Sequence, residues 1–136
     1  MQAGAFTNPN INLRKEAIQL TKEACDWAIA LNAKEVVVWS AFDGYDYSLQ
    51  CNYHALWDHV IQGFQEVCDN YPTLKISLEY KPTDENTRFF AISSTGSAQM
   101  LVNEVNRDNF GLTLDFGHCL MAGIIMILIY YYIYFR

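Results

Sequence analysis

Helical and extended patterns alternate along this chain of 136 residues, and the alternation limits the folds that it can adopt. Apolar residues recur at helical spacing in three segments, 11–31, 53–70 and 94–105. Extended segments follow them at 35–39, 75–80 and 111–115. Repeated strand–helix units with right-handed crossovers build a parallel sheet, so we predict an α/β fold. Either a doubly wound sheet or part of a (β/α)8 barrel fits. A complete barrel has about 250 residues, so three strands would be well under half of one.

The first extended segment differs from the other two in its pattern. Residues Val36, Val37, Val38 and Trp39 are apolar without interruption. Such a run is typical of a strand that is buried on both faces of a parallel sheet. A long loop is predicted after it, over residues 40–52, and a short extended stretch over 88–92.

The second extended segment ends in polar residues that alternation places on one face. Ile76, Leu78 and Tyr80 share one side of the strand, which suits packing against helices. Glu79 and Lys81 lie on the opposite side, at the carboxyl end. The strand therefore presents a carboxylate and an ammonium group side by side.

The third extended segment repeats this arrangement. Leu112 and Leu114 share a face, Asp115 lies on the opposite one, and His118 follows in a turn. If the two strands are parallel neighbours, these polar groups converge with those of the second strand at one edge of the sheet.

Two carboxylates and an imidazole are suitable ligands for a divalent cation. Carboxylate oxygens favour Mg²⁺ and Mn²⁺, and imidazole favours Co²⁺ and Zn²⁺. The pattern predicts such a site from Glu79, Asp115 and His118, with Lys81 beside it to stabilise negative charge on a substrate oxygen. The alternative is purely structural, with Glu79 and Lys81 as an ion pair and Asp115 as the cap of the next turn.

Charge and cysteine content narrow the classes of partner. The net charge is −6, and the 9 Lys and Arg residues form no cluster, which argues against nucleic acid and anionic membranes. No C-x-x-C pair occurs among the cysteines Cys25, Cys51, Cys68 and Cys119. We expect reduced thiols and a cytoplasmic protein, since the polar start also lacks the hydrophobic stretch of a signal peptide.

The last residues differ in composition from everything before them. Residues 124–135 are Ile, Met, Leu, Tyr and Phe only. We therefore predict a domain over 1–123 and a separate hydrophobic tail over 124–136. A reading-frame change or a misassigned gene end would give such a sequence. The alternative is a membrane-associated segment, because the 17 residues of 119–135 are at the lower limit for spanning a bilayer.

Two short motifs resemble a known family. Leu78-Glu79-Tyr80-Lys81-Pro82 resembles the glutamate-x-lysine-proline signature of the xylose isomerase-like TIM-barrel superfamily. Leu114-Asp115-Phe116-Gly117-His118 resembles its aspartate-x-x-histidine signature on the next strand. Residues 4–9 and 38–47 are also similar to members described as sugar isomerases, so the likeness covers about residues 3 to 123.

The resemblance implies a fold and roles for particular residues. The chain would carry the end of strand three and strands four to six of a (β/α)8 barrel, with the site at the carboxyl ends of the strands. Glu79 and Asp115 would be metal ligands, and His118 would bind a second metal or the substrate. Lys81 would polarise the sugar oxygen. Trp39 would line the sugar pocket, unless it packs in the core.

The implied activity is the interconversion of aldoses and ketoses, a metal-dependent isomerisation of a small sugar. Related epimerases transfer a proton with a pair of glutamates, and Lys81 favours the isomerase. Tyr80 stands where xylose isomerases carry proline, which puts xylose itself in doubt. Complete members of the family form homo-oligomers. Because further ligands come from strands seven and eight, we expect this chain to be inactive by itself. A non-catalytic fragment is the alternative, and a zinc endonuclease relative is disfavoured by the lack of basic clusters.

Overall fold

The computed structural model describes residues 4–40, 42–82 and 89–124. Helices and strands alternate in it, with two very short strands inserted. The elements are α1 (Ile11–Ala30), β1 (Glu35–Trp39), β2 (Gly44–Tyr45), α2 (Tyr53–Asn70), β3 (Lys75–Glu79), β4 (Phe89–Phe90), α3 (Thr95–Val105), β5 (Phe110–Thr113) and α4 (Phe116–Met121).

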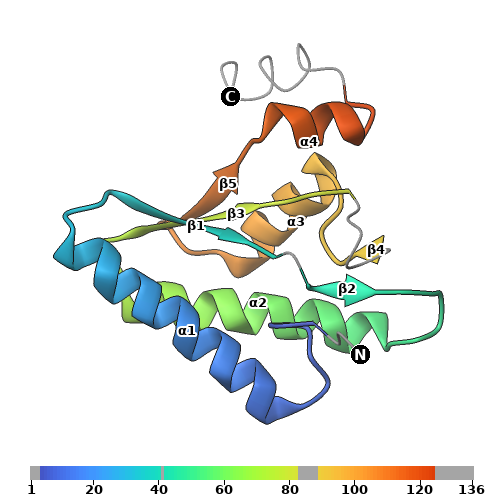
Figure 1. Ribbon diagram of the computed structural model, residues 1–136, viewed down its shortest axis with the longest axis horizontal. Coiled ribbons are helices and arrows are strands. Elements are labelled where there is room, and N and C mark those ends of the chain that lie inside the picture. The colour runs from blue at the N-terminus through green and yellow to red at the C-terminus, as the bar shows by residue number, and fades with distance from the viewer. Residues whose placement is uncertain (1–3, 41, 83–88, 125–136) are drawn as a thin grey trace.

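The main sheet is parallel, and its strand order β1-β3-β5 confirms the predicted sequential arrangement (Figure 1). Trp39 lies opposite Glu79, which lies opposite Thr113 on the other side. The predicted β1 bounds are confirmed. However, β3 ends one residue earlier than predicted, and β5 ends at Thr113 rather than at residue 115. The reason is that Asp115 has left the sheet and caps α4.

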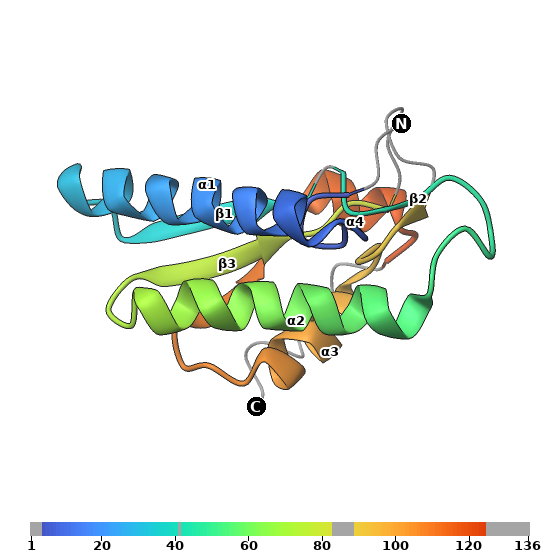
Figure 2. The same cartoon turned by 90° about the horizontal axis from the view of Figure 1, so that it is seen from below.

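Helices α1, α2 and α3 cover one face of the sheet. Helix α1 contacts α2, and α2 contacts α3 (Figures 1 and 2). All three helices contribute buried side chains to one core cluster with the strands. This one-sided cover is the arrangement of a barrel wall, and the doubly wound alternative is excluded for the described residues.

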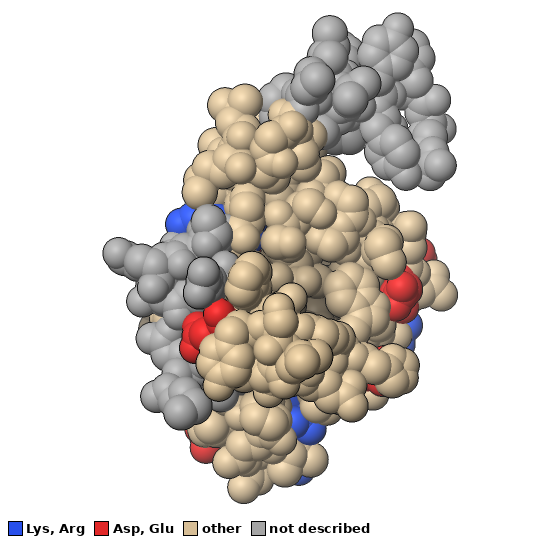
Figure 3. All heavy atoms as spheres, turned by 90° about the vertical axis from the view of Figure 1, so that its right-hand side faces the viewer, with Lys and Arg blue, Asp and Glu red and all other residues tan. Residues whose placement is uncertain are grey.

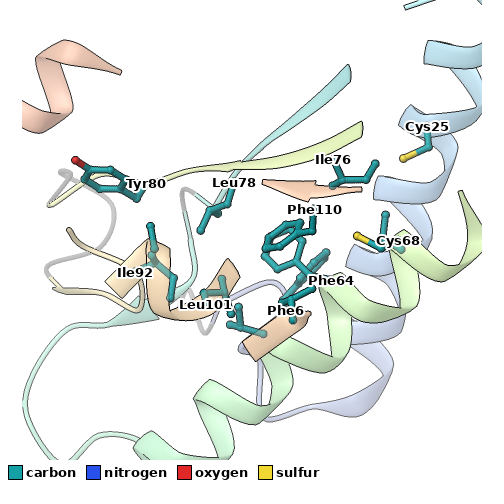
Figure 4. Close-up of a cluster of buried hydrophobic side chains, with 14 of the residues drawn as sticks. Phe6, Cys25, Phe64, Cys68, Ile76, Leu78, Tyr80, Ile92, Leu101 and Phe110 are labelled. Atoms are coloured by element: carbon teal, nitrogen blue, oxygen red, sulfur yellow. The ribbon is translucent and has the colours of Figure 1, made fainter. Parts of the chain in front are cut away.

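The core lies between these helices and the sheet. Ile76 and Leu78 of β3 and Phe110 of β5 point into it, as Figure 4 shows. The Phe64 ring of α2 contacts both Phe110, at 4.6 Å between centroids, and Phe6, at 5.1 Å. A Cβ atom at Gly63 would lie 2.7 Å from the Phe6 ring, so only glycine lets the start of the chain pack against α2.

The opposite face of the sheet is open, which corrects one prediction. Strand β1 is not buried on both sides, because Val37 and Trp39 are each 46% exposed while Val36 and Val38 pack against the core. Among the described residues, no layer covers this inner face. An uninterrupted apolar run predicts burial on two faces only where a second layer is present.

Side-chain capping sets where the helices begin. Asn10, Asn52 and Ser94 are the N-caps of α1, α2 and α3, and each accepts a hydrogen bond from a backbone N–H of the first turn. The predicted start of the third helix at Ser94 is confirmed. Asn32, after α1, has a φ of 56°, a left-handed conformation that asparagine tolerates.

Two features were not predicted. The extended stretch predicted over 88–92 contains β4, but its antiparallel pairing with β2, which lies in the predicted loop, was not predicted. Asp43, just before β2, is buried and binds the start of the chain. Its Oδ1 accepts hydrogen bonds from Ala5 N at 2.8 Å, Thr7 N at 2.8 Å and Thr7 Oγ1 at 2.7 Å. Its carbonyl also accepts from Ala91 N.

The chain after β5 contains the remaining helix. His118 lies in α4 and not in a turn, which corrects the prediction for that residue. Most of the predicted tail, residues 125–136, lies outside the described residues. Among the helices that the structure describes, none is long and apolar enough to cross a bilayer.

Candidate metal centre

The candidate centre lies at the carboxyl ends of β3 and β5. Glu79 is the last residue of β3, and Asp115 and His118 follow β5. The Asp115 side chain accepts a hydrogen bond from the backbone N–H of His118 at 3.0 Å and so caps α4. The cap explains the local sequence, since the aspartate and the histidine three positions later then lie in one helical turn.

The structure brings three of the predicted residues together. One ligand atom each from Glu79, Asp115 and His118 lies within 4.8 Å of the other two. His118 Nδ1 is 3.4 Å from Glu79 Oε1. This nitrogen is buried, and among the described residues it has no hydrogen-bond partner. An unpartnered buried nitrogen beside two carboxylates is an arrangement that a divalent cation would complete.

The electrostatics of the centre favour ionised carboxylate. The hydrogen bond from the backbone of His118 holds the pKa of Asp115 below its usual value, and the charges of His118 and Lys81 act in the same direction. Asp115 is therefore in the anionic form that a cation requires throughout the neutral range.

Lys81 and Trp39 lie next to the centre without belonging to the three-residue cluster. The Lys81 Nζ atom is over the Trp39 ring, 5.5 Å from its centroid. Trp39 is the register partner of Glu79, so its ring is on the inner face of the sheet with the cluster. It is half exposed, and the alternative that it packs in the core is wrong.

Three contacts around the centre were missed from the sequence. On the inner face, Ser77 Oγ and Thr113 Oγ1 form a hydrogen bond of 2.6 Å. On the helix side, the Tyr80 hydroxyl contacts Thr95 Oγ1 at 2.6 Å and Cys119 Sγ at 3.1 Å. Alternation along the strands gives the faces of these residues, but it does not give their partners.

The cysteines behave as predicted. All four are free, and Cys25, Cys68 and Cys119 are buried. Burial raises the pKa of the Cys68 thiol to about 11, so it is protonated at neutral pH. A buried protonated thiol is a poor nucleophile and a poor metal ligand.

Comparison with known proteins agrees with the fold. Residues 2–130 match the model of the family described as xylose isomerase-like TIM barrel. A xylose isomerase from Thermus thermophilus is 27% identical over 126 residues, which are 89% of this chain and 32% of that protein. The chain thus spans about a third of that relative's length.

Solved structures share the fold. An AP endonuclease of family 2 from Brucella melitensis superposes with a TM-score of 0.70 at 22% identity, over 95% of this chain and 46% of that one. A D-tagatose 3-epimerase-like protein superposes with a TM-score of 0.64 at 26% identity, over 87% of this chain and 43% of that one. The family match extends across nearly the whole chain, and this chain belongs to the xylose isomerase-like TIM-barrel family.

Proposed function

We propose that this chain carries part of the divalent-metal centre of a sugar isomerase that interconverts aldoses and ketoses. The observation that supports the proposal best is the convergence of Glu79, Asp115 and His118 within 4.8 Å at the carboxyl ends of neighbouring parallel strands. Membership of the family, and the relationship to a xylose isomerase, support the choice of reaction.

The residues present suit the metal. Glu79 and Asp115 provide hard oxygen ligands, and His118 Nδ1 provides a nitrogen that has no other partner. Mixed oxygen and nitrogen ligands accept Mn²⁺, Mg²⁺, Co²⁺ or Zn²⁺. A bound divalent cation would supply Lewis acidity toward the sugar carbonyl, which would make transfer of hydrogen between adjacent carbons easier.

The neighbouring side chains have roles in holding the sugar. The half-exposed Trp39 ring offers an apolar surface to the C–H face of a sugar, and Lys81 Nζ lies above the same ring. From there the ammonium group stabilises negative charge that develops on a sugar oxygen. We propose Lys81 and His118 as the catalytic residues and Trp39, Lys81 and His118 as substrate contacts.

The three ligands of the described residues do not complete a coordination shell. A hard divalent cation takes about six ligands, so water would supply the remainder. Catalysis needs groups held within about half an ångström, which a partly built shell does not ensure. We therefore expect weak metal binding and little turnover from this chain alone. A non-catalytic role, or membrane association through residues 124–136, is the alternative.

A sugar epimerase is the second candidate function. The D-tagatose 3-epimerase-like protein supports it, being 26% identical. The presence of Lys81 favours the isomerase. A nuclease is disfavoured because Lys and Arg form separate spots on the face shown in Figure 3, without a continuous basic surface.

Titration with Mn²⁺, followed by the electron paramagnetic resonance signal of the free ion, tests the proposal. The chain should bind one Mn²⁺, and the double variant Glu79→Gln/Asp115→Asn should lose at least tenfold in affinity. The variant Glu16→Gln is the control, since it removes one exposed carboxylate from α1. No binding by the unmodified chain, or equal loss in the control, would contradict the proposal. Assays with aldoses and with ketohexoses then separate isomerase from epimerase.

A further inference from the structure

We propose that Tyr80 is a positioning residue for the candidate metal centre. Its hydroxyl contacts Cys119 on the helix side of the sheet and thereby keeps α4 where His118 reaches Glu79. The importance of Tyr80 for metal binding rests on the proposed function, but the contact itself can be tested without metal.

The Tyr80 hydroxyl is a buried junction between three elements. Tyr80 directly follows β3 and is 2% exposed. Its oxygen lies 2.6 Å from Thr95 Oγ1, at the first position of α3, and 3.1 Å from Cys119 Sγ, in α4. A buried polar group that loses such partners pays its full desolvation cost, so the junction strongly prefers one arrangement.

The junction and the metal centre are formed by adjacent residues on the two sides of the same strand end. Glu79 faces His118 on the inner side, at 3.4 Å between Oε1 and Nδ1. Tyr80 faces Cys119 on the helix side. Because residues 79 and 80 are consecutive, as are 118 and 119, a shift of α4 that breaks one contact moves the other.

Within the described part of the chain, few other contacts hold helix α4 in position. It is six residues long, and Cys119 is its one buried residue, while Phe116 and Leu120 are each 67% exposed. The Asp115 cap fixes its start, and Ala122 beyond its end packs partly against the core. The Tyr80–Cys119 contact is thus a side-chain hydrogen bond that ties the middle of this short helix to the end of β3.

The contact also does not change with pH over the range in which the cation would bind. Burial raises the pKa of Tyr80 to about 12, so the hydroxyl keeps its proton at neutral pH. Its effect on His118 is geometric and does not depend on a titration of Tyr80.

The variant Tyr80→Phe tests the inference because it removes the hydroxyl and keeps the ring. Mn²⁺ affinity should fall about tenfold, the size of effect seen when a group that orients a ligand is lost. Without metal, amide hydrogen exchange in α4 should become faster. The matched control is Tyr71→Phe, whose hydroxyl also has two partners, Lys22 O and Asp26 Oδ1, between α2 and α1. It should leave the affinity and α4 exchange unchanged.

Variants of the partner residue separate positioning from general stability. Cys119→Ala should lower the Mn²⁺ affinity as much as Tyr80→Phe does. The double variant should bind Mn²⁺ no more weakly than either single variant. Cys119→Ser, which keeps a hydrogen-bonding group, should retain most of the affinity. Unchanged α4 exchange in Tyr80→Phe would overturn the inference, whether or not metal binds. Faster exchange in a chain that binds no Mn²⁺ would support the positioning contact and contradict the metal centre alone.

Discussion

The two faces of the main sheet differ sharply, although the same three strands form both. On the helix side, Ile76 and Leu78 are at most 1% exposed and contribute to a continuous apolar core. On the inner side, Val37 and Trp39 are half exposed, and the remaining positions carry hydroxyl, carboxylate, ammonium and glycine. Stability should therefore depend on one face and metal chemistry on the other.

The difference follows from the alternation of side chains along each strand, which separates the residues that stabilise the core from those that can bind a metal. Each apolar side chain on the helix side stabilises the fold by leaving water, so the residues there must be apolar. Exposed inner positions such as Val37 gain little from burial, and the strand end on this face is available for ligands such as Glu79. The five predictions that follow run from the largest expected effect to the smallest, and those on Leu78 and Ser77 test this separation directly.

Truncating side chains of the neighbouring strands β3 and β1 on opposite faces of the sheet should have unequal effects. Leu78→Ala, on the buried side, should lower the free energy of unfolding by about 3 kcal/mol through lost burial and a cavity. Val37→Ala, on the open side, should cost less than about 1 kcal/mol because the side chain is already half in water. Urea denaturation measures both. Equal losses would mean that the inner face is covered in solution.

The buried carboxylate of Asp43 should contribute as much to the free energy of unfolding as many apolar core residues do. Asp43→Ala leaves the amides of Ala5 and Thr7 without their acceptor, at a cost of about 2 kcal/mol. Asp43→Asn keeps an acceptor oxygen and should cost less.

The same pair of variants gives a pH test. Burial raises the pKa of Asp43, against the opposing effect of hydrogen bonds from Thr7 and Ala5. For a raised pKa, the stabilising contribution is complete below the unfolded value and is lost as pH rises through the folded value. The stability of the natural chain relative to Asp43→Asn should therefore fall as pH rises. A rise would show that the hydrogen bonds outweigh burial.

The hydroxyl pair on the inner face should have a smaller effect. Ser77→Ala removes the hydrogen bond to Thr113 Oγ1 and should cost about 1 kcal/mol, since Ser77 is 2% exposed. Combining it with Thr113→Val should recover part of the loss, because no unpaired hydroxyl remains. Chemical denaturation of the two single variants and the double variant measures the coupling, and additive losses would contradict a direct bond.

The cap of α4 should give the smallest change in stability, visible chiefly in its pH dependence. The pKa of Asp115 is lowered by the His118 amide, so its contribution is present above the unfolded pKa and lost as pH falls through the folded value. Asp115→Asn keeps the cap without the charge. The melting temperatures of the natural chain and of Asp115→Asn should differ near neutral pH and converge in acid. A difference that persists in acid would assign the effect to something other than the carboxylate.

Much of the fold could be predicted from the sequence because it follows from local periodicity. The helix over 53–70 and the strand over 35–39 match their predicted bounds, and the faces of Leu78 and Glu79 follow from alternation. The approach of Glu79 to Asp115 could be expected because parallel neighbours end at one edge of a sheet.

What could not be predicted depends on distant partners. Strands β2 and β4 have two residues each and exist only by pairing with one another. Helix α4 is too short for a periodic pattern, although the Asp115 cap signal was present in the sequence. The exposure of Trp39 depends on which layer lies over the sheet, and no feature of residues 36–39 carries that information.

The contact between Asp43 and Thr7 has a consequence for the order in which the chain is assembled during synthesis. The acceptor residue, Asp43, is synthesised 36 residues after the donor residue, Thr7. At ~5–20 residues per second, the start of the chain waits about 2 to 7 seconds for its anchor. Helix α1 can form during this interval, but the segment before it cannot yet be fixed. The segment around Thr7 is therefore synthesised before its anchor and is set in place only after Asp43 has been made.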